Sequence, residues 1–333
     1  MATDPTLSTD PAPPSRRTPR GAATRWAIQA SIETLAQVGR ALPNGRRHLA
    51  RVSVTHDVSY GPLDDHRLDV YRPAGSTERL PVMLYVHGGG FAFCSRQTHW
   101  SIAARYARMG FVVFNIDYRL APAHRFPAAF DDAARALAFV LGQAPAHGGD
   151  PARLVLAGES AGGNLVTALT AATTHRLDHG PARELFELAP TLSAVLPACG
   201  VLQVTDVERF KRNKPHLPDS IARQLVAMRR SYLGRGAHPV DRLYLADPLR
   251  LLEDRAPDRP LPPAFVLVGA RDFLLDDSRR LHAALTARGA RSELRIYPGE
   301  IHAFHALPWR DAARDCWREQ RAFLASLGLV EPG

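Results

Sequence analysis

The sequence predicts an α/β protein with a mostly parallel, twisted sheet flanked by helices, together with a helical cap. Short aliphatic and β-branched runs alternate along the chain with helical segments, which is typical of parallel strands joined by crossover helices. Two of these runs end directly at glycine-rich turns, HGGGF at 87–91 and GESAGG at 158–163. The 333 residues include 45% hydrophobic and 23% charged residues, a composition that suits a globular chain with a sizeable core.

The first 50 residues divide into two predicted parts. Residues 1–22 are rich in Pro, Ser, Thr and Arg and cannot bury enough apolar surface to fold alone, so we expect a disordered tail. Residues 23–50 are predicted to hold a helix over 23–39 that contributes to a cap. The apolar residues of this helix recur near helical spacing at Trp26, Ile28, Ile32 and Leu35.

Eight strand candidates follow. Residues 52–61 and 66–73 are predicted to pair as antiparallel strands, the first alternating between apolar and polar side chains. These strands predict one α/β domain that comprises residues 51–203 and 246–333. Short apolar runs predict the remaining six strands, at 81–86, 111–116, 154–157, 193–198, 264–268 and 292–297.

One segment interrupts the alternation of strands and helices. Residues 204–245 are polar, contain a predicted helix over 220–233, and stand where a single crossover helix would be sufficient. An insertion of this length between core strands usually covers a functional site, so we interpret it as part of the cap. A solvated surface excursion is the alternative interpretation.

The charge and the cysteines exclude several classes of function. The net charge of +9 comes almost wholly from scattered arginines, and no nucleic-acid-binding motif accompanies them, so we expect no nucleic-acid partner. Cys94, Cys199 and Cys316 lie far apart without C-x-x-C spacing, which predicts neither a disulfide framework nor a metal site. Cys199 stands in an apolar run and is interpreted as a small buried hydrophobic residue.

Targeting signals are weak. A twin arginine at 16–17 is not followed by a continuous apolar stretch, and no segment is long and apolar enough to span a membrane. We therefore expect a cytoplasmic protein, with an export role for the twin arginine left open.

The two glycine motifs predict a serine nucleophile. GESAGG fits G-x-S-x-G, in which Ser160 would occupy a sharp turn between a strand and a helix that needs small neighbours. HGGGF provides flexible backbone whose N–H groups can face a developing oxyanion. No phosphate-binding glycine spacing surrounds either motif, so the pair indicates acyl transfer.

The acid and the base are predicted from the loops that follow later strands. In folds with this nucleophile turn, the chain order is serine, acid, histidine, each at the carboxyl end of a strand. Asp272 is favoured as the acid because it lies nearest the end of the strand at 264–268, whereas Asp276 and Asp277 suit the first turn of the following helix.

The strand at 292–297 leads into IHAFHAL, which offers two histidines as the base. His302 is favoured because it comes first in the loop. His305 would lie one turn further on and is interpreted as a packing or rim residue.

Four stretches together resemble the hormone-sensitive-lipase-like family of α/β-hydrolase carboxylesterases, also called bacterial lipase family IV. They are HGGGF, DYRLAPAHRFPAAFDD at 117–132, GESAGG, and the pair RDFLLDD and IHAF. The resemblance covers about 82–304 and implies an α/β-hydrolase catalytic domain with a cap. It also implies that Ser160 is the nucleophile, His302 the general base and then acid, and Asp272 the residue that orients the imidazole.

The resemblance implies further roles around the nucleophile. His87 is expected to hold the glycine loop through a side-chain hydrogen bond, and Glu159 to lie behind the turn as a supporting residue. Two departures from the family pattern, Phe273 and Ala303, put the local loop shape in question. The backbone groups implied for the oxyanion hole are those of Gly89, Gly90 and Ala161, with Gly88 as an open alternative to one of the two glycines.

The expected reaction is hydrolysis of short- to medium-chain acyl esters through an acyl-enzyme, with no metal or organic cofactor, by a monomer or homodimer. An amidase or peptidase on the same scaffold is one alternative. A small-molecule receptor is another, although such receptors lose the catalytic histidine, and His302 is present. Residues expected either to line an acyl pocket or to pack the cap onto the core are Trp26, Ile28, Leu225, Val226 and Met228.

Overall fold

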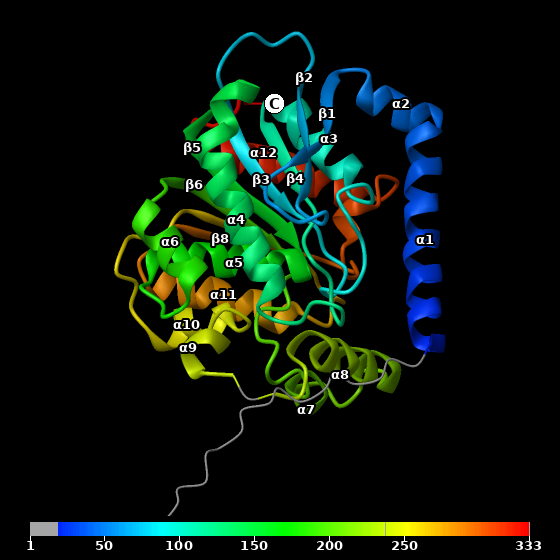
Figure 1. Cartoon of the computed structure of the whole chain (residues 1–333), viewed down its shortest axis with the longest axis vertical. Coiled ribbons are helices and arrows are strands. Elements are labelled where there is room, and N and C mark those ends of the chain that lie inside the picture. The colour runs from blue at the N-terminus through cyan, green and yellow to red at the C-terminus, as the bar shows by residue number, and fades with distance from the viewer. Residues whose placement is uncertain (1–18, 237, 333) are drawn as a thin grey trace, which may run out of the picture.

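The computed structural model describes residues 19–236 and 238–332. It confirms the predicted α/β architecture, with one eight-stranded sheet in the order β1-β2-β4-β3-β5-β6-β7-β8 (Figure 1). β2 pairs antiparallel with β1 and with β4, and the remaining neighbours are parallel. The strands are β1 (Val52–Ser59), β2 (Arg67–Pro73), β3 (Leu80–Val86), β4 (Val112–Ile116), β5 (Gly149–Glu159), β6 (Leu192–Ala198), β7 (Ala264–Gly269) and β8 (Ser292–Tyr297).

Helices cover both faces of the sheet because successive strand side chains point to opposite faces. Leu84 packs into the cluster formed with α4, α5 and α11, whereas its neighbour Tyr85 packs into the cluster formed with α3 and α12. The helices are α1 (Pro19–Ala41), α2 (Pro43–Leu49), α3 (Trp100–Met109), α4 (Ala128–Gln143), α5 (Ala161–Thr174), α6 (Gly180–Leu188), α7 (Arg209–Asn213), α8 (Asp219–Leu233), α9 (Val240–Leu243), α10 (Pro248–Asp254), α11 (Leu275–Ala287) and α12 (Asp311–Ser326). Two short 3-10 helices lie at Ala144–His147 and Phe304–Ala306.

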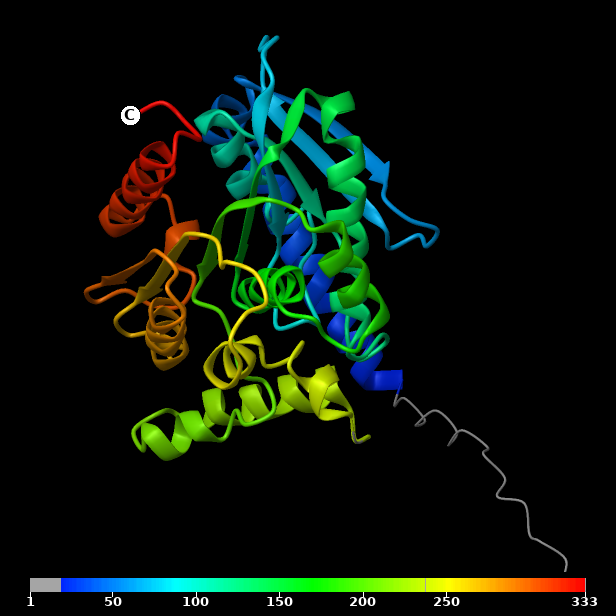
Figure 2. The ribbon, with the colours of Figure 1, turned by 90° about the vertical axis from the view of Figure 1, so that its left-hand side faces the viewer.

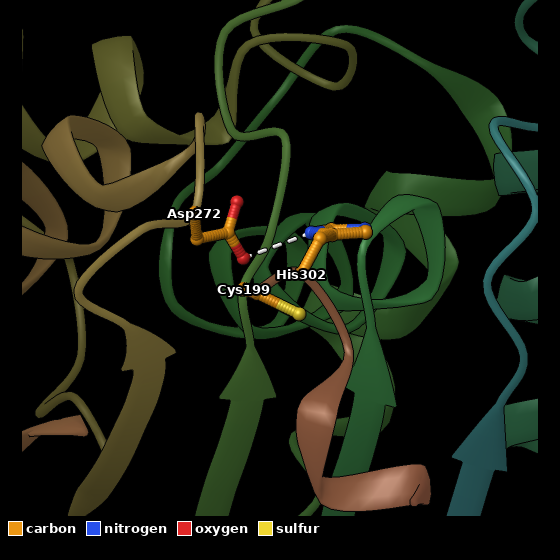
Figure 3. Close-up of side chains that lie close together, drawn as sticks. All are labelled: Cys199, Asp272 and His302. Atoms are coloured by element: carbon orange, nitrogen blue, oxygen red, sulfur yellow. Dashed lines mark hydrogen bonds and ion pairs between the residues drawn. The ribbon is translucent and has the colours of Figure 1, made fainter. Parts of the chain in front are cut away.

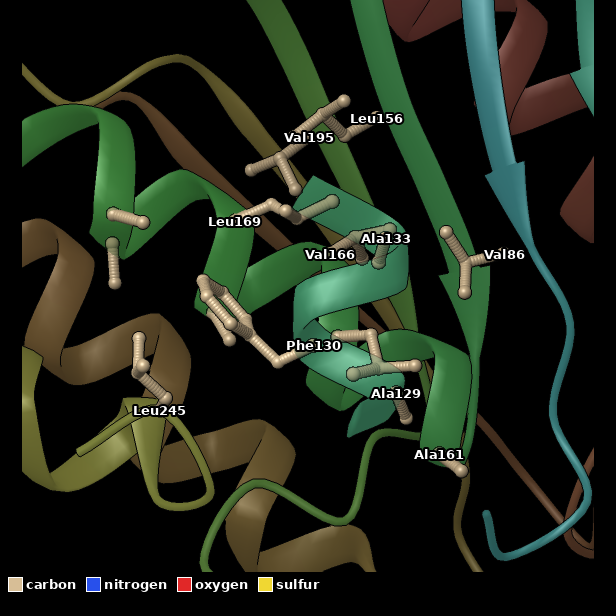
Figure 4. Close-up of a cluster of buried hydrophobic side chains, with 14 of the residues drawn as sticks. Val86, Ala129, Phe130, Ala133, Leu156, Ala161, Val166, Leu169, Val195 and Leu245 are labelled. Carbon is tan, nitrogen blue, oxygen red and sulfur yellow. The ribbon is translucent and has the colours of Figure 1, made fainter. Parts of the chain in front are cut away.

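The core beneath α4 and α5 holds the central strands in place. Figure 4 shows aliphatic side chains of β3, β5 and β6 meeting side chains of both helices. Phe130 of α4 and Leu169 of α5 are completely buried there. Burying each such side chain contributes about 1.5–3 kcal/mol, so this packing rigidly supports the strand ends. Other members of the cluster are Val86, Ala129, Ala133, Leu156, Val166 and Val195.

Two predicted boundaries differ from the structure by four or five residues. The first helix begins at Pro19, so 19–22 are helical although they were expected in the disordered tail; the rest of that tail lies outside the described residues. Proline is tolerated in the first turn of a helix, where its missing N–H has no partner to lose. β5 begins at Gly149 instead of 154, because Leu80 of β3 pairs with Gly149 before the strand becomes apolar.

The segment at 204–245 folds as a layer of its own. It contains α7, α8 and α9, and Figure 2 shows α7 and α8 beyond the end of the sheet, apart from the helices on its two faces. α8 therefore lies opposite the loops that follow the parallel strands. In the described part of the chain, no helix combines the length and the apolar character needed to cross a membrane.

Candidate active site

The turn between β5 and α5 presents Ser160. The backbone of this residue has φ 54° and ψ −114°, a left-handed conformation that is uncommon outside glycine. Gly162 allows the turn, because a Cβ atom on it would lie 2.0 Å from the Val86 carbonyl oxygen at the end of β3. α5 can therefore start directly against the sheet only if this position is glycine.

The structure brings Ser160, His302 and Asp272 together from three separate loops. The Nε2 atom of His302 lies 3.0 Å from the Ser160 Oγ atom, and its Nδ1 atom lies 2.9 Å from Asp272 Oδ2. The second carboxylate oxygen of Asp272 accepts the backbone N–H of Leu274 at 2.8 Å. Since the Asp272 side chain has no exposed surface, its orientation is set by these two bonds.

The surroundings of His302 favour its protonated form. Burial of the ring works against protonation, but the adjacent Cys199 sulfur and the Asp272 carboxylate outweigh it and raise the pKa of His302 well above its ordinary value. Phe273 lies beside the ring, with centroids 5.0 Å apart. A base with a raised pKa accepts a proton from a hydroxyl more readily once it is itself deprotonated.

The glycine loop at 87–91 lies beside the turn that carries Ser160. Gly89 has φ 104° and Gly90 has φ 59°, both in the region that favours glycine, and both line the cleft that contains Ser160. Gly88 instead faces the buried side of the loop, where a Cβ atom would lie 3.0 Å from the Glu159 carbonyl oxygen. Ala161, at the first position of α5, is fully buried.

His87 is packed beneath this loop. Its Nδ1 atom lies 2.7 Å from the Gly88 carbonyl oxygen, and burial lowers the pKa of His87 to about 3, so the ring is neutral and donates this hydrogen bond from Nδ1. Tyr118, from the DYRLAP stretch, stacks on the imidazole with centroids 4.3 Å apart and donates a hydrogen bond to the His87 carbonyl oxygen. This arrangement supports the glycine loop from its buried side.

A buried carboxylate connects three of the segments that form the site. Glu159, next to Ser160, lies 2.9 Å from His99 Nε2 and 2.9 Å from His305 Nε2. Burial of Glu159 opposes its ionisation, but the adjacent imidazoles of His305 and His99 outweigh this and hold the pKa of its carboxyl well below the usual range. His305 is thus a buried packing residue, not a rim residue.

Replacing Glu159 by glutamine is expected to destabilise the fold by about 1–3 kcal/mol at pH 7, because an amide NH2 group takes the place of one of the two carboxylate oxygens that face the buried imidazoles. A depressed folded-state pKa stabilises the protein above the unfolded value of 4.5 and loses that effect as pH falls. The stability difference between parent and Glu159→Gln should therefore narrow below about pH 4.5. Urea unfolding of both proteins at pH 7 and pH 4 measures this difference in the free energy of unfolding.

The matched control for this prediction is the exposed Glu187, whose change to glutamine should leave the unfolding midpoint near that of the parent. A Glu159→Gln protein as stable as the parent at pH 7 would contradict the prediction.

The two alternative acids have other partners. Asp277 is fully buried. Its carboxylate accepts hydrogen bonds from Arg209 Nη2 at 2.5 Å and from the Leu202 backbone N–H at 2.9 Å. Asp276 lies 3.3 Å from Lys214 Nζ and is partly exposed. Both lie in the first turn of α11, as expected, and neither hydrogen-bonds to His302 in the structure.

A cleft of about 600 Å³ opens above Ser160, between the glycine loop and α8. The α8 residues that line it recur at the spacing of one helix face, so a single face of α8 covers Ser160. Val226, expected either to line the pocket or to pack the cap onto the core, lies on the opposite face of α8, in a separate groove, and packs against the core cluster. The residues of α8 on the cleft are Ile221, Gln224, Leu225, Ala227, Met228 and Ser231.

The N-terminal helix α1 packs beside the segment that follows the glycine loop. Gln29 exchanges two hydrogen bonds with the backbone of Cys94, and the Ala36 carbonyl oxygen accepts one from Trp100 Nε1. Among the described side chains of α1, none lines the cleft. Trp26 and Ile28, expected over an acyl pocket, lie outside the residues whose side chains are described.

Comparison with known proteins identifies relatives over most of the chain. Residues 83–306 match the model of a family described as having the alpha/beta hydrolase fold. The chain is 34% identical to Carboxylesterase NlhH of Mycobacterium tuberculosis over 250 residues, which cover 74% of this chain and 73% of the relative. It is also 31% identical over 255 residues to the Ethyl acetate hydrolase of Pseudomonas putida, with 74% of each chain covered.

Solved structures share the fold. An esterase of Pyrobaculum calidifontis superposes with a TM-score of 0.70 at 26% identity, covering 92% of this chain and 94% of that chain. A structure titled Bacterial Heroin Esterase gives a TM-score of 0.76 over 92% of each chain; at 23% identity it supports the fold alone.

Proposed function

Because the chain belongs to the hormone-sensitive-lipase-like family of α/β-hydrolase carboxylesterases, we propose that Ser160, His302 and Asp272 are the residues with which it hydrolyses esters. The protein is a carboxylic ester hydrolase. The observation that carries the assignment is the continuous hydrogen-bonded path from Ser160 Oγ through His302 to Asp272.

In the first half of the reaction, Ser160 Oγ attacks the ester carbonyl carbon while His302 Nε2 takes the hydroxyl proton. The C–O bond to the alcohol then breaks, and the imidazolium returns its proton to the departing alkoxide. Asp272 keeps the Nδ1 proton in place and stabilises the positive ring that forms in between. The product of this half-reaction is an acyl ester of Ser160.

Water completes the cycle. His302 Nε2 removes a proton from a water molecule, which attacks the acyl carbon, and the same ring protonates Ser160 Oγ as the carboxylic acid leaves. Both tetrahedral intermediates place a negative oxygen near the glycine loop. We assign its stabilisation to the backbone N–H groups of Gly89 and Gly90, which line the cleft, and of Ala161, which directly follows Ser160.

The acyl-enzyme step has a direct test. Stopped-flow mixing with p-nitrophenyl acetate should release a burst of p-nitrophenol close to one equivalent per chain if deacylation is the slower step. An organophosphate should label Ser160 stoichiometrically and abolish the burst. Labelling of another residue with full loss of activity would exclude Ser160 as the nucleophile.

We further propose that the cleft accepts short to medium acyl chains. Its volume of about 600 Å³ falls in the range of small-molecule sites, and its α8 face is largely apolar. The name of the Pseudomonas relative, Ethyl acetate hydrolase, supports a small ester substrate. Parallel assays with matched anilides test the amidase alternative, which predicts comparable rates on both.

Met228 is expected to limit the acyl chain. Its side chain lies over the glycine loop, with Cγ 3.4 Å from the position that a Cβ on Gly90 would take. Met228→Ala should make the enzyme prefer a p-nitrophenyl ester with a longer acyl chain. The ratio of kcat/KM values for two esters that differ by one methylene should change by at most about 10- to 200-fold relative to the parent. Val226→Ala, on the opposite face of α8, is the matched control and should leave the profile unchanged; identical profiles for Met228→Ala and parent would refute the role.

Two further expectations stay proposals. We propose that the enzyme acts in the cytoplasm, and that it is a monomer or homodimer. Light scattering with size-exclusion chromatography distinguishes the two states.

A further inference from the structure

Cys199 lies beside the proposed acid and base, although the reaction above does not use it. The residue follows β6 directly, is 1% exposed, and has φ 37°, a left-handed conformation for a residue with a side chain. Its backbone N–H donates to the Leu267 carbonyl oxygen at 2.8 Å, which holds the turn against β7. Figure 3 shows its sulfur close to the His302 ring, with the Asp272 carboxylate nearby.

These three side chains present one sulfur, one carboxylate oxygen and one imidazole nitrogen, all within 4.8 Å of one another. Among the residues that the structure describes, they form the cluster of His, Cys and carboxylate groups with spacing suited to a metal ion. We propose that Cys199, Asp272 and His302 form a binding site for Zn²⁺ and related thiophilic divalent ions, and that occupancy reversibly inhibits the esterase. The inhibition part rests on the proposed role of His302.

The donor set matches the chemistry of zinc. Zn²⁺ binds thiolate at about 2.3 Å, imidazole at about 2.0–2.1 Å and carboxylate oxygen at about 2.0–2.2 Å, so tetrahedral donors lie about 3.5 Å apart. The widest separation in the cluster is below 4.8 Å, and closing it needs movements of about 1 Å shared between loops. Thiolate favours zinc and cadmium over magnesium and calcium, which prefer oxygen ligands.

Access runs through the cleft. His302 lines the cleft of about 600 Å³, whereas Cys199 and Asp272 lie behind it. A metal ion entering from the cleft would meet the imidazole first and then the two buried donors. Three protein ligands leave the fourth tetrahedral position for water, as in other zinc sites with an open position.

Metal on either nitrogen of His302 removes the base. On Nε2 it occupies the lone pair that would take the proton of Ser160. On Nδ1 it displaces the hydrogen bond to Asp272 and leaves the proton on Nε2, so that the ring has no free lone pair facing the serine. Binding also releases the proton of the Cys199 thiol, because the thiolate is the ligand.

Binding is tested without catalysis in the Ser160→Ala protein, stripped with EDTA and dialysed. Titration with Cd²⁺ should produce the ultraviolet charge-transfer absorption of a cadmium–thiolate bond and saturate at one ion per chain. The added change Cys199→Ala should abolish the band, whereas Cys316→Ala, which removes another buried cysteine, should retain it. An absent band, or one that survives Cys199→Ala, overturns the site.

Inhibition is tested in the parent enzyme with p-nitrophenyl butyrate. Zn²⁺ should inhibit, EDTA should restore the rate, and Mg²⁺ should have no effect. Each variant is compared with its own metal-free rate, and Cys199→Ala should raise the half-inhibitory Zn²⁺ concentration at least about tenfold, since even loss of an outer-sphere partner costs 10–100-fold in affinity. Equal Zn²⁺ sensitivity in both proteins overturns the proposal. If the proposed serine mechanism itself were wrong, the Ser160→Ala protein would retain esterase activity, and this outcome is independent of the Zn²⁺ measurements.

Discussion

Ser160→Ala is expected to lower kcat for p-nitrophenyl butyrate by about 10³- to 10⁶-fold, the range found when a residue that acts in a catalytic unit is removed. The side chain loses the oxygen that would form the acyl-enzyme, while the cleft and the glycine loop stay intact. Residual activity would come from the remaining oxyanion donors acting on water. Steady-state rates, with far-UV circular dichroism as a check of folding, measure the effect.

Ser231 is the matched control for this experiment. It lies on α8 and lines the same cleft as Ser160, but the structure gives it no hydrogen bond to His302. Ser231→Ala should therefore retain a rate near that of the parent. A folded Ser160→Ala enzyme with the parent rate would eliminate Ser160 as the nucleophile.

Asp272→Asn is expected to lower kcat by about 10⁴-fold, because an amide that donates to Nδ1 holds the imidazole in the tautomer that cannot accept the serine proton. The change should also move the pH profile. Activity is lost as pH falls and His302 becomes protonated, and the carboxylate helps to raise the pKa of His302. Without the Asp272 carboxylate, the acid limb of the pH profile of kcat/KM should shift to lower pH. The maximal value of kcat/KM should fall at the same time.

The control for this variant is Asp276→Asn, four residues later on the surface of α11, which should keep the parent rate and the parent pH profile. Asp277 is unsuitable because its buried pair with Arg209 makes any change destabilising. Measurements from pH 5 to 9 in EDTA separate the protonation of His302 from metal binding. If the acid limb of the Asp272→Asn enzyme lay at the same pH as that of the parent, the Asp272 carboxylate would not raise the pKa of His302 as proposed.

Most of the framework could be predicted from local sequence. A buried parallel strand reads as a short apolar run, and each functional loop begins where such a run ends, so Ser160, Asp272 and His302 could be placed at strand ends one at a time. Choosing Asp272 over Asp276 needed only the distance from the strand end. Boundaries such as the start of β5 were less accurate, because they depend on pairing with β3.

The partners of the supporting residues could not be predicted in this way. Glu159 was expected behind the nucleophile turn, but its contacts with His99 and His305 join residues that are 60 and 146 positions away in the chain. Likewise, Val226 and Met228 are two residues apart and both apolar, yet they face different cavities. Which face of α8 covers Ser160 depends on how the whole segment at 204–245 packs.

The sequence by itself therefore determined the α/β class, the order of the strands along the chain, and the three side chains offered after β5, β7 and β8, because these follow from local hydrophobic pattern and turn chemistry. Only the tertiary structure decided which side chains meet: the Glu159 carboxylate between two imidazoles, the Cys199 sulfur beside His302, and the shape of the cleft. Such contacts arise when loops from different strands are packed against one another, and no short stretch of sequence contains them.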